Sequence, residues 1–313
     1  MAKRVAIVGA GVSGLTCGVV LAERGFHTAI FAKEIGQQTT SGAAAAIWFP
    51  YDAQPAEKVI PWALETYKAL IDLTRDPRSG VSMIDLRQFS RTGEIQIPDW
   101  ALPLGAAAVA TGLRPVFKSG FSLRVPLTDT TIYLDYLAAR LLRAGGTING
   151  QVCFEKLEEV DRDFDLVINC AGIGARELVR DTDLEPHRGQ VVIVPRVEDL
   201  SRAIVCDDAP LMYAIPRTND CVFGGTNDLS SDLAADPATT NRIIAECSRV
   251  LNIERPNVLA ARVGLRPFRK SGVRLDREKL RDGRIVIHNY GHGGSGFTLS
   301  WGCAREVRDM ATL

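Results

Sequence analysis

Two glycine-rich segments, one near each end of the chain, have the composition of loops that hold a ligand. The first is GAGVSG, in which Gly9, Gly11 and Gly14 have the G-x-G-x-x-G spacing. In this spacing the first glycine makes a tight turn, the second lets the backbone approach a pyrophosphate, and the third lets a helix pack closely on a strand. The N-terminal segment therefore predicts a dinucleotide site.

The second segment is GHGGSG, residues 291–296. An apolar strand is expected before it, over residues 285–288, and a helix after it, over residues 297–310. Glycine lets backbone approach a ligand closely, and the start of a helix favours negative or electron-rich groups. Two such loops at opposite ends indicate one ligand that is clasped by both ends of the chain.

The first loop must be positioned by the elements around it. Residues 4–31 predict a strand, the loop, a helix and a second strand, which is the order of a βαβ unit. A dinucleotide-binding unit commonly has an acid at the end of its second strand, where it holds the ribose hydroxyls. Here Ala32 and Lys33 come first and Glu34 follows, so the acid is absent or displaced.

Small residues occur at two further places. An apolar strand is expected over residues 164–172, and it ends in a small-residue turn, at the edge of a parallel sheet where ligands bind. The stretch 39–51 begins with Thr39, Thr40 and Ser41, which offer hydroxyls and amides to a ligand. On pattern alone this stretch is equally the start of an alanine-rich helix.

The remaining periodicity predicts further helices and strands. The helices are expected over residues 55–73, 128–145 and 239–251, the strands within 81–97, 120–127 and 188–226, and a loop over 98–120. Their order predicts an α/β fold in which a Rossmann-like domain is braided in sequence with an antiparallel-sheet domain.

Composition narrows the class of function. Lys plus Arg and Asp plus Glu number 37 each in 313 residues, so bulk charge points to neither nucleic acid nor a membrane surface. No apolar run reaches about 18 residues, so no membrane span is expected. The four histidines form no metal-binding pattern, and no G-x-S-x-G elbow or Walker A lysine is present. Seven cysteines without a C-x-x-C pair favour a reducing cytoplasm, and a disulfide between Cys206 and Cys221 is left open.

The C-terminal sequence HNYGHGGSGFTLSWGCA resembles the signature of the D-amino-acid oxidase family of flavoenzymes, which includes D-aspartate oxidase. The resemblance extends to the N-terminal glycine loop, to TTSGAAAAIWFPY and to VRLD, and so covers nearly the whole chain. It implies an FAD-binding domain formed by residues 1–50, 127–180 and 275–313, and a substrate-binding domain formed by 51–126 and 181–274.

The resemblance also implies which residues bind the cofactor. They lie in the two glycine loops, at the end of the second strand, in the stretch 39–51 and at the small-residue turn: Gly9, Ala10, Gly11, Val12, Ser13, Gly14, Ala32, Lys33, Thr39, Thr40, Ser41, Ala45, Ala46, Ile47, Val152, Ala171, Gly172, Gly293, Gly294, Ser295, Gly296, Phe297 and Thr298.

For the substrate, the resemblance implies an arginine that holds a carboxylate, which the planar guanidinium can bind in a bidentate way. We expect this arginine to be Arg274, ahead of Arg262, Arg266 and Arg269. Tyr213 would donate a hydrogen bond to the same carboxylate, and the carbonyl of Gly294 would accept one from the substrate amine. Phe49 would make the pocket more apolar.

The activity implied is oxidative deamination of D-amino acids, with neutral ones expected. Hydride would pass from the substrate Cα to flavin N5, and oxygen would reoxidise the flavin with release of hydrogen peroxide. The partners are then a D-amino acid and oxygen, with no nucleic acid, membrane or metal, and a homodimer is left open.

Three alternatives stay open. A D-aspartate oxidase would need a second cation, for which Arg217 is the candidate. Glycine or sarcosine oxidases share the N-terminal loop but not the long C-terminal signature. A flavin- or NAD-binding protein without catalysis would share the glycine fingerprint alone.

Overall fold

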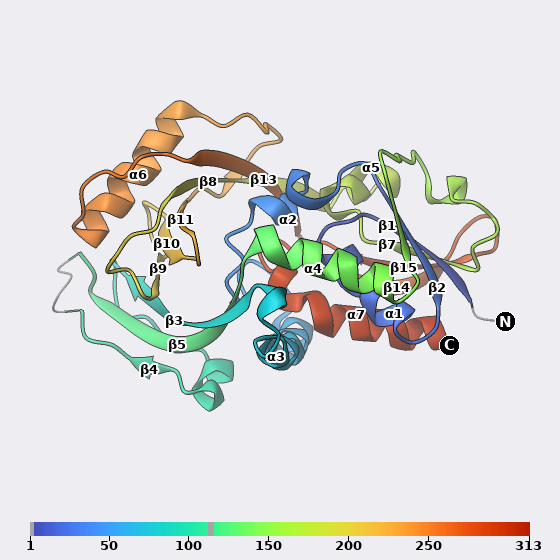
Figure 1. Cartoon of the computed structure of the whole chain (residues 1–313), viewed down its shortest axis with the longest axis horizontal. Coiled ribbons are helices and arrows are strands. Elements are labelled where there is room, and N and C mark those ends of the chain that lie inside the picture. The colour runs from blue at the N-terminus through green and yellow to red at the C-terminus, as the bar shows by residue number, and fades with distance from the viewer. Residues whose placement is uncertain (1–2, 112–115) are drawn as a thin grey trace.

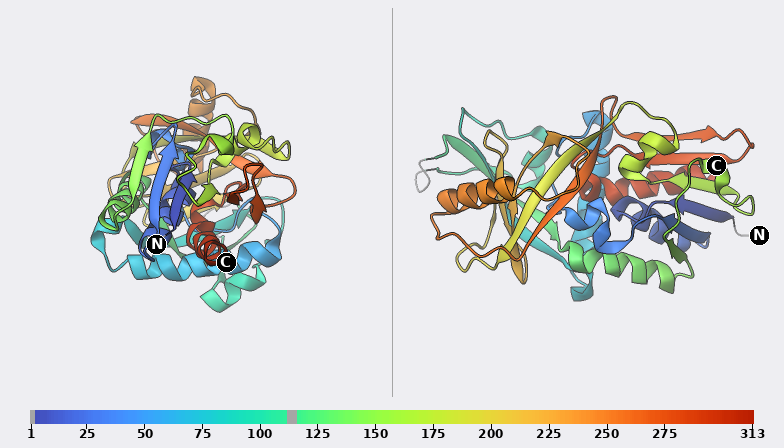
Figure 2. Two further views of the ribbon diagram at one scale, coloured as in Figure 1. Left: turned by 90° about the vertical axis from the view of Figure 1, so that its right-hand side faces the viewer. Right: turned by 90° about the horizontal axis from the view of Figure 1, so that it is seen from above.

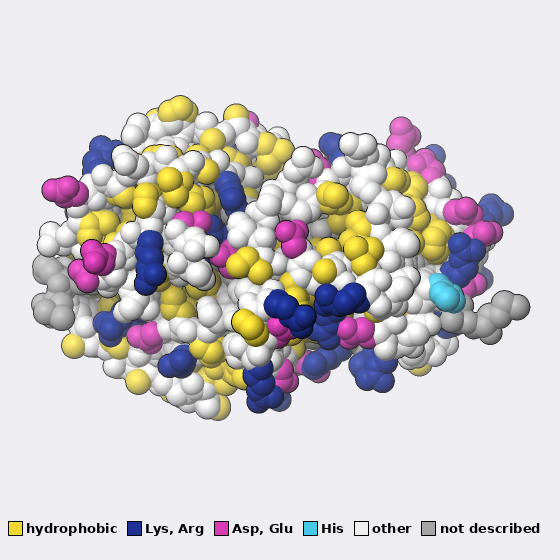
Figure 3. All heavy atoms as spheres, in the orientation of Figure 1, with side chains coloured by type: hydrophobic (Ala, Val, Ile, Leu, Met, Phe, Trp, Pro, Cys, Tyr) yellow, Lys and Arg dark blue, Asp and Glu magenta, His cyan; other side chains and the backbone are white. Residues whose placement is uncertain are grey.

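The computed structural model describes residues 3–111 and 116–313 as two β-sheets, with helices around them. One sheet lies on the right in Figure 1 and the other on the left, and both ends of the chain lie on the right-hand side. The view from above separates the same two halves (Figure 2). Side chains of both charges lie on both halves of the face drawn in Figure 3, in keeping with the zero net charge.

The right-hand sheet has six strands in the order β14-β15-β7-β1-β2-β6, parallel except for the antiparallel edge strand β14. Their bounds are β1 Arg4–Val8, β2 His27–Ala32, β6 Thr147–Gly150, β7 Leu166–Asn169, β14 Arg274–Lys279 and β15 Ile285–Tyr290. The first and last parallel strands of the chain therefore flank β7, so the two glycine loops leave the same edge of one sheet.

The faces of β1 follow from its alternation. Val5 and Ile7 pack in the large core that includes the helices, whereas Ala6 and Val8 pack on the opposite face with Leu157 and its neighbours. Helix α1 (Val12–Ala22) packs between α7 (Gly296–Thr312) and α4 (Thr130–Arg143) on the first of these faces. Both faces of the sheet are thus covered, as parallel sheets require.

The left-hand sheet has nine strands, eight of them in the order β12-β8-β11-β10-β9-β3-β5-β4, with β13 also pairing with β8. Their bounds are β3 Val81–Ser90, β4 Ala107–Ala108, β5 Ser119–Thr128, β8 Leu184–Pro195, β9 Ala203–Cys206, β10 Met212–Pro216, β11 Asp220–Gly224, β12 Asp228–Leu229 and β13 Ala260–Arg269.

Helix α6 (Pro237–Leu251) covers one face of this second sheet, where Ile243, Ile244 and Cys247 pack on Val192 and Ala214. Asp236 caps the helix by accepting hydrogen bonds from the amides of its first turn. The opposite face of the sheet turns toward the first sheet and is where the cavity described below lies. The other helices are α2 (Thr40–Ala43), α3 (Ala56–Leu73) and α5 (Ala175–Leu178).

Most of the sequence-based expectations agree with these bounds, and three need comment. The predicted loop over 98–120 contains a 3₁₀ turn over Asp99–Leu104 and the short strand β4, while residues 112–115 lie outside the described residues. All seven cysteines are free thiols, and β10 separates the strands that carry Cys206 and Cys221, so the disulfide left open is not formed. Helix α3, expected in the substrate-binding domain, packs along α7. The domain boundaries stay a prediction.

No helix in the described part of the chain combines the length and hydropathy of a membrane span.

Candidate active site

A cavity of about 620 Å³ is lined by both glycine loops and by the inner face of the nine-stranded sheet. Its volume is within the range of pockets that bind cofactors and substrates. Both loops therefore line one cavity, as the sequence analysis predicted.

At one end of the cavity the chain turns from β1 into α1 without room for side chains. A Cβ added at Gly9 would lie 2.3 Å from the carbonyl oxygen of Cys170, and one at Gly14 would lie 1.9 Å from that of Gly9. Gly9 also has a φ of +111°, which favours glycine. Ser41 closes the turn, because its Oγ accepts a hydrogen bond from Val12 N over 3.0 Å.

The start of α7 forms the facing wall, and two hydroxyls fix it to the chain after α2. Ser295 Oγ accepts from Tyr51 N over 2.7 Å and donates to Tyr51 O. Thr298 Oγ1 makes the same pair of bonds with Phe49, at 3.1 Å from its N and 3.0 Å from its O. These four bonds set Phe49 and Tyr51 beside the C-terminal glycine loop.

Buried polar side chains support the C-terminal loop from below. Asn289 Nδ2 donates to Ser13 Oγ over 3.0 Å, and its Oδ1 accepts from His292 Nε2 over 3.0 Å. Burial lowers the pKa of His292 to about 4, so its imidazole is neutral at pH 7. Asn289 thus connects the two glycine loops directly.

Most of the predicted cofactor-binding residues line the cavity, and two do not. Gly14 packs against Gly9 beneath the turn, and Ser295 is fully buried with its hydroxyl used by Tyr51. Both position the cavity wall. Glu34, which follows the displaced end of β2, also lines the cavity and is the acid available there.

At the other end, glycines make room for two polar side chains of the nine-stranded sheet. The ring of Tyr213 lies over Gly224 and Gly225, where a Cβ would come within 2.0 and 2.8 Å of it. The guanidinium of Arg266 lies over Gly189, where a Cβ would come within 2.5 Å. Burial raises the pKa of Tyr213, whereas the nearby charge of Arg266 lowers it. Both side chains line the cavity.

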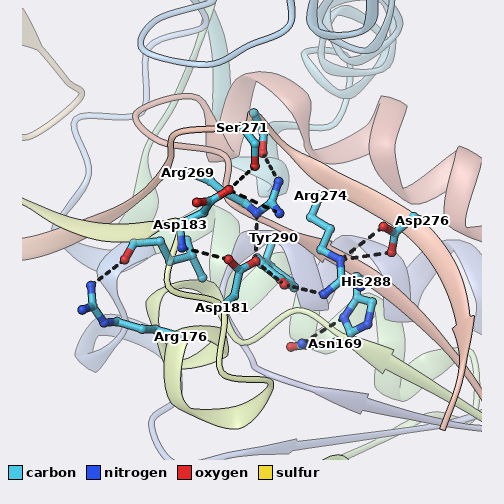
Figure 4. Close-up of polar contacts among 12 residues, drawn as sticks. Asn169, Arg176, Asp181, Asp183, Arg269, Ser271, Arg274, Asp276, His288 and Tyr290 are labelled. Carbon is cyan, nitrogen blue, oxygen red and sulfur yellow. Dashed lines mark hydrogen bonds and ion pairs between the residues drawn. The ribbon is translucent and has the colours of Figure 1, made fainter.

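The position of Arg274 differs from the one that the sequence analysis predicted. It is not among the residues that line the cavity, and Figure 4 shows it among residues of the six-stranded sheet. Its guanidinium donates to Tyr290 Oη over 3.0 Å and pairs with Asp276 and Glu278 at 3.2 and 2.8 Å. The reason is topological: β13 belongs to one sheet and β14 to the other, and Arg274 is the first residue of β14.

Three other arginines also have internal partners. Arg217 is buried, with Asp220 at 2.6 Å and Asp129 at 3.7 Å. Arg269 pairs with Asp181 at 2.8 Å, and Arg262 donates to the carbonyl of Gly42 over 3.1 Å. None of these guanidinium groups replaces Arg266 in the cavity.

The sequence analysis did not identify Tyr51, Gln88 or Asp207, and it ranked Arg266 behind Arg274. Tyr51, Gln88, Asp207 and Arg266 all line the cavity. A signal was available for two of them. Asp207 follows Val205 by two residues at the end of a strand, and Gln88 follows Leu86, so alternation puts each pair on one face.

Residues 4–310 match the family model described as FAD dependent oxidoreductase (DAO). This chain belongs to that family. Among its relatives, a D-amino-acid oxidase from Rubrobacter xylanophilus is 40% identical, over 98% of this chain and 95% of the relative. A D-amino-acid oxidase from Streptomyces coelicolor is 37% identical, with 98% and 96% covered, and human D-aspartate oxidase is 32% identical, with 99% and 94% covered.

The fold is also found in a solved oxidase structure. Glycine oxidase from Geobacillus kaustophilus superposes with a TM-score of 0.83 at 18% identity, over 99% of this chain and 95% of that one. The predicted α/β fold, with a Rossmann-like sheet and a second sheet, is confirmed.

The family's cofactor is FAD, and the cavity suits it chemically. The helices α1 and α7 both start at the cavity, and the N-cap residues Gly11 and Ser295 do not cap them with their side chains. Ser41 takes up one first-turn amide of α1, that of Val12, which leaves the amides after it for anionic groups. The absent side chains of the glycine loop leave backbone next to the space. The residues that would hold FAD are those of the two loops, Glu34 and the small-residue turn at Ala171 and Gly172.

Proposed function

We propose that this protein catalyses the oxidative deamination of D-amino acids to 2-oxo acids, with release of ammonia and hydrogen peroxide. The observation that carries the proposal is the placement of Arg266 and Tyr213 across one cavity from the C-terminal glycine loop. The 37–40% identity to D-amino-acid oxidases over nearly the whole chain supports it.

Arg266 is the proposed anchor for the substrate carboxylate, in place of Arg274. Its Nη1 donates to the backbone carbonyl of Thr226 over 2.9 Å, which fixes the guanidinium while other N–H groups remain for a ligand. Tyr213 is the proposed second donor, because its raised pKa keeps the phenol protonated at neutral pH.

Gly294 is the proposed acceptor for the substrate amine through its backbone carbonyl. It lines the cavity and has no side chain to block approach, and a Cβ there would come within 2.5 Å of the Tyr51 ring. With the carboxylate and the amine held at two fixed points, the Cα–H is oriented. Orientation of this kind can supply roughly 7–11 kcal/mol of a barrier. FAD, when bound, supplies the two-electron oxidant that oxygen regenerates.

Arg217 does not supply the second cation that a D-aspartate oxidase would need. Its side chain is only 1% exposed and is paired with Asp220, so it is not available to a second carboxylate. Phe49 packs against Trp100 and Phe121 and lines the cavity, which favours a substrate side chain with apolar character. We therefore propose neutral rather than acidic D-amino acids.

We also propose a cytoplasmic location, because the free cysteines suit a reducing compartment. A homodimer is the assembly to test, by light scattering of the purified protein.

The test is hydrogen peroxide release by FAD-loaded protein from a panel of D- and L-amino acids, with glycine and sarcosine included. Release from neutral D-amino acids, and little from D-aspartate, is expected. Release from glycine and sarcosine alone would replace the proposal with a glycine oxidase. No release from any member, with FAD bound, would overturn the substrate class.

A further inference from the structure

One carboxylate lines the substrate end of the cavity. Asp207 follows directly after β9, and Val205, Asp207, Leu211, Tyr213 and Ile215 all line the cavity. The register explains this, because Tyr213 lies opposite Val205 and alternate residues share one face of the sheet. Asp207 therefore lies on the same face as Tyr213, the proposed carboxylate donor.

A buried amide holds the Asp207 carboxylate. Gln88, which is 5% exposed, donates from Nε2 to Asp207 Oδ2 over 2.8 Å. No Lys, Arg or His nitrogen of residues 3–111 and 116–313 lies within ion-pair distance of Asp207. The neighbouring Asp208 differs, because it accepts from Arg91 N and Ser90 Oγ over 2.6 and 2.9 Å. Asp208 is thus occupied by its own loop, whereas Asp207 is turned to the cavity without a cation.

Asp207 lies within electrostatic reach of the residues around the substrate. Besides burial, its charge raises the pKa of both Tyr51 and Tyr213, and the charge of Arg266 lowers both. Asp207 itself is exposed, and partial desolvation by the protein around it raises its pKa. The substrate end of the cavity therefore has one positive group, the Arg266 guanidinium, and one negative group, the Asp207 carboxylate.

Apolar side chains line the cavity as well. Phe49 comes from the chain after α2, Leu86 from β3, Val205 from β9 and Ile215 from β10. Such walls suit a hydrocarbon stem. A carboxylate in the same cavity suits the end of that stem only if the end is a cation or a hydrogen-bond donor.

We infer that Asp207 is a specificity-determining residue that receives the cationic end of a substrate side chain, so that the substrate range extends from neutral D-amino acids to D-lysine and D-ornithine and excludes acidic ones. The inference rests on the proposed function, because it assumes that Arg266 holds the α-carboxylate. An acidic side chain would meet repulsion from Asp207, whereas an ammonium would provide a counter-ion for a carboxylate that has no cationic partner among residues 3–111 and 116–313.

The test compares D-lysine with D-norleucine, which has a similar stem without the charge, in FAD-loaded wild-type protein and in Asp207→Asn. The variant is expected to lower kcat/KM for D-lysine by about tenfold, leave that for D-norleucine within about twofold, and raise that for D-glutamate. The matched control is Asp85→Asn, which removes a carboxylate from the same sheet at a residue that pairs with Arg87 at 3.6 Å outside the cavity. It is expected to leave the D-lysine to D-norleucine ratio unchanged.

The outcomes separate the two proposals. An unchanged ratio in Asp207→Asn, with both substrates oxidised, overturns the inference and leaves the proposed function standing. Peroxide from no D-amino acid, with flavin absorbance intact, overturns both. If Asp207→Asn fails to bind FAD, Gln88→Leu is measured instead, since it removes the hydrogen bond that orients Asp207. A D-lysine to D-norleucine ratio equal to wild type in that variant also overturns the inference.

Discussion

Arg274 Nη1 donates a hydrogen bond to Tyr290 Oη over 3.0 Å, and the two residues face each other on the paired strands β14 and β15. Tyr290 in turn donates to Asp181 Oδ2 over 2.8 Å, and Asp181 also accepts from Arg269 Nε over 2.8 Å. The chain shown in Figure 4 therefore ties the edge of the six-stranded sheet to the segment before β8. Its role is to hold the two sheets together.

Arg274→Ala is expected to lower the free energy of unfolding by about 1–3 kcal/mol, because a largely buried side chain loses several polar partners. The KM for a D-amino acid should stay at the wild-type value. Urea unfolding with saturating FAD measures the first, and peroxide kinetics the second. Arg75→Ala is the control, since its side chain is 80% exposed and its loss should change little. A KM rise at Arg274→Ala would return the anchor to that residue.

Arg266→Ala is expected to have the opposite profile. Loss of a desolvated anchor for a carboxylate typically costs about 2–5 kcal/mol, so kcat/KM should fall on the order of 100-fold or more, mainly through KM. Flavin absorbance of the purified variant should be retained. Arg266→Lys should recover only part of the loss, because a point charge lacks the bidentate fork. Wild-type kinetics in Arg266→Ala would contradict the proposed site.

Gly14→Ala is expected to yield protein with little bound FAD. A Cβ there would come within 1.9 Å of the carbonyl of Gly9, so the turn that carries the N-terminal loop must shift. Absorbance of the flavin bands after desalting measures the effect. Gly93→Ala is the matched control, because a Cβ there meets nothing within 4 Å. Equal flavin content in the two variants would remove the loop from the cofactor site.

The stability of the protein is expected to decrease as the pH falls from 6.5 to 4. Burial lowers the folded pKa of His292 to about 4, below its ordinary 6.5, so in this window the unfolded chain binds a proton that the folded chain does not. The full shift corresponds to about 3 kcal/mol. In His292→Gln this part of the pH dependence of urea unfolding should be lost, whereas exposed His27→Gln should retain it. An unchanged slope in His292→Gln would contradict the assignment.

Cys153 provides a label for the cofactor end of the cavity. It is exposed and lines the cavity, and the other six cysteines are buried. In FAD-stripped protein one thiol should react quickly with a chromogenic disulfide, FAD should slow that reaction, and Cys153→Ser should abolish it. A rate that FAD does not affect would place the cofactor elsewhere.

The parts of the site that could be predicted from the sequence are those that a short segment of the chain encodes. The glycine spacing around Gly11 and around Gly294 specifies a strand, a turn and a helix within one short segment, and both are found. The cap at Asp236 and the start of α4 after Asp129 are local signals of the same kind.

The substrate anchor could not be chosen in this way. Arg266 and Arg274 occur in one arginine-rich run, and each alternates with apolar neighbours. Which of them enters the cavity depends on the turn at Gly272, whose φ of +88° lets the chain leave one sheet and join the other. That partition depends on long-range pairing with β8 and β15, as does the position of Asp207 beside Gln88.

The two glycine loops, joined through Asn289 and Ser13, are separated in the chain by nearly its whole length. During synthesis the first loop leaves the ribosome long before α7 exists to face it. At about 5–20 residues per second, the wait between Gly14 and Gly296 is roughly 15–55 seconds. For that interval α1 lacks its neighbour α7 and β7 lacks its neighbour β15, so part of their apolar surface stays uncovered. We therefore expect the cofactor to bind late, when synthesis of the chain is nearly complete.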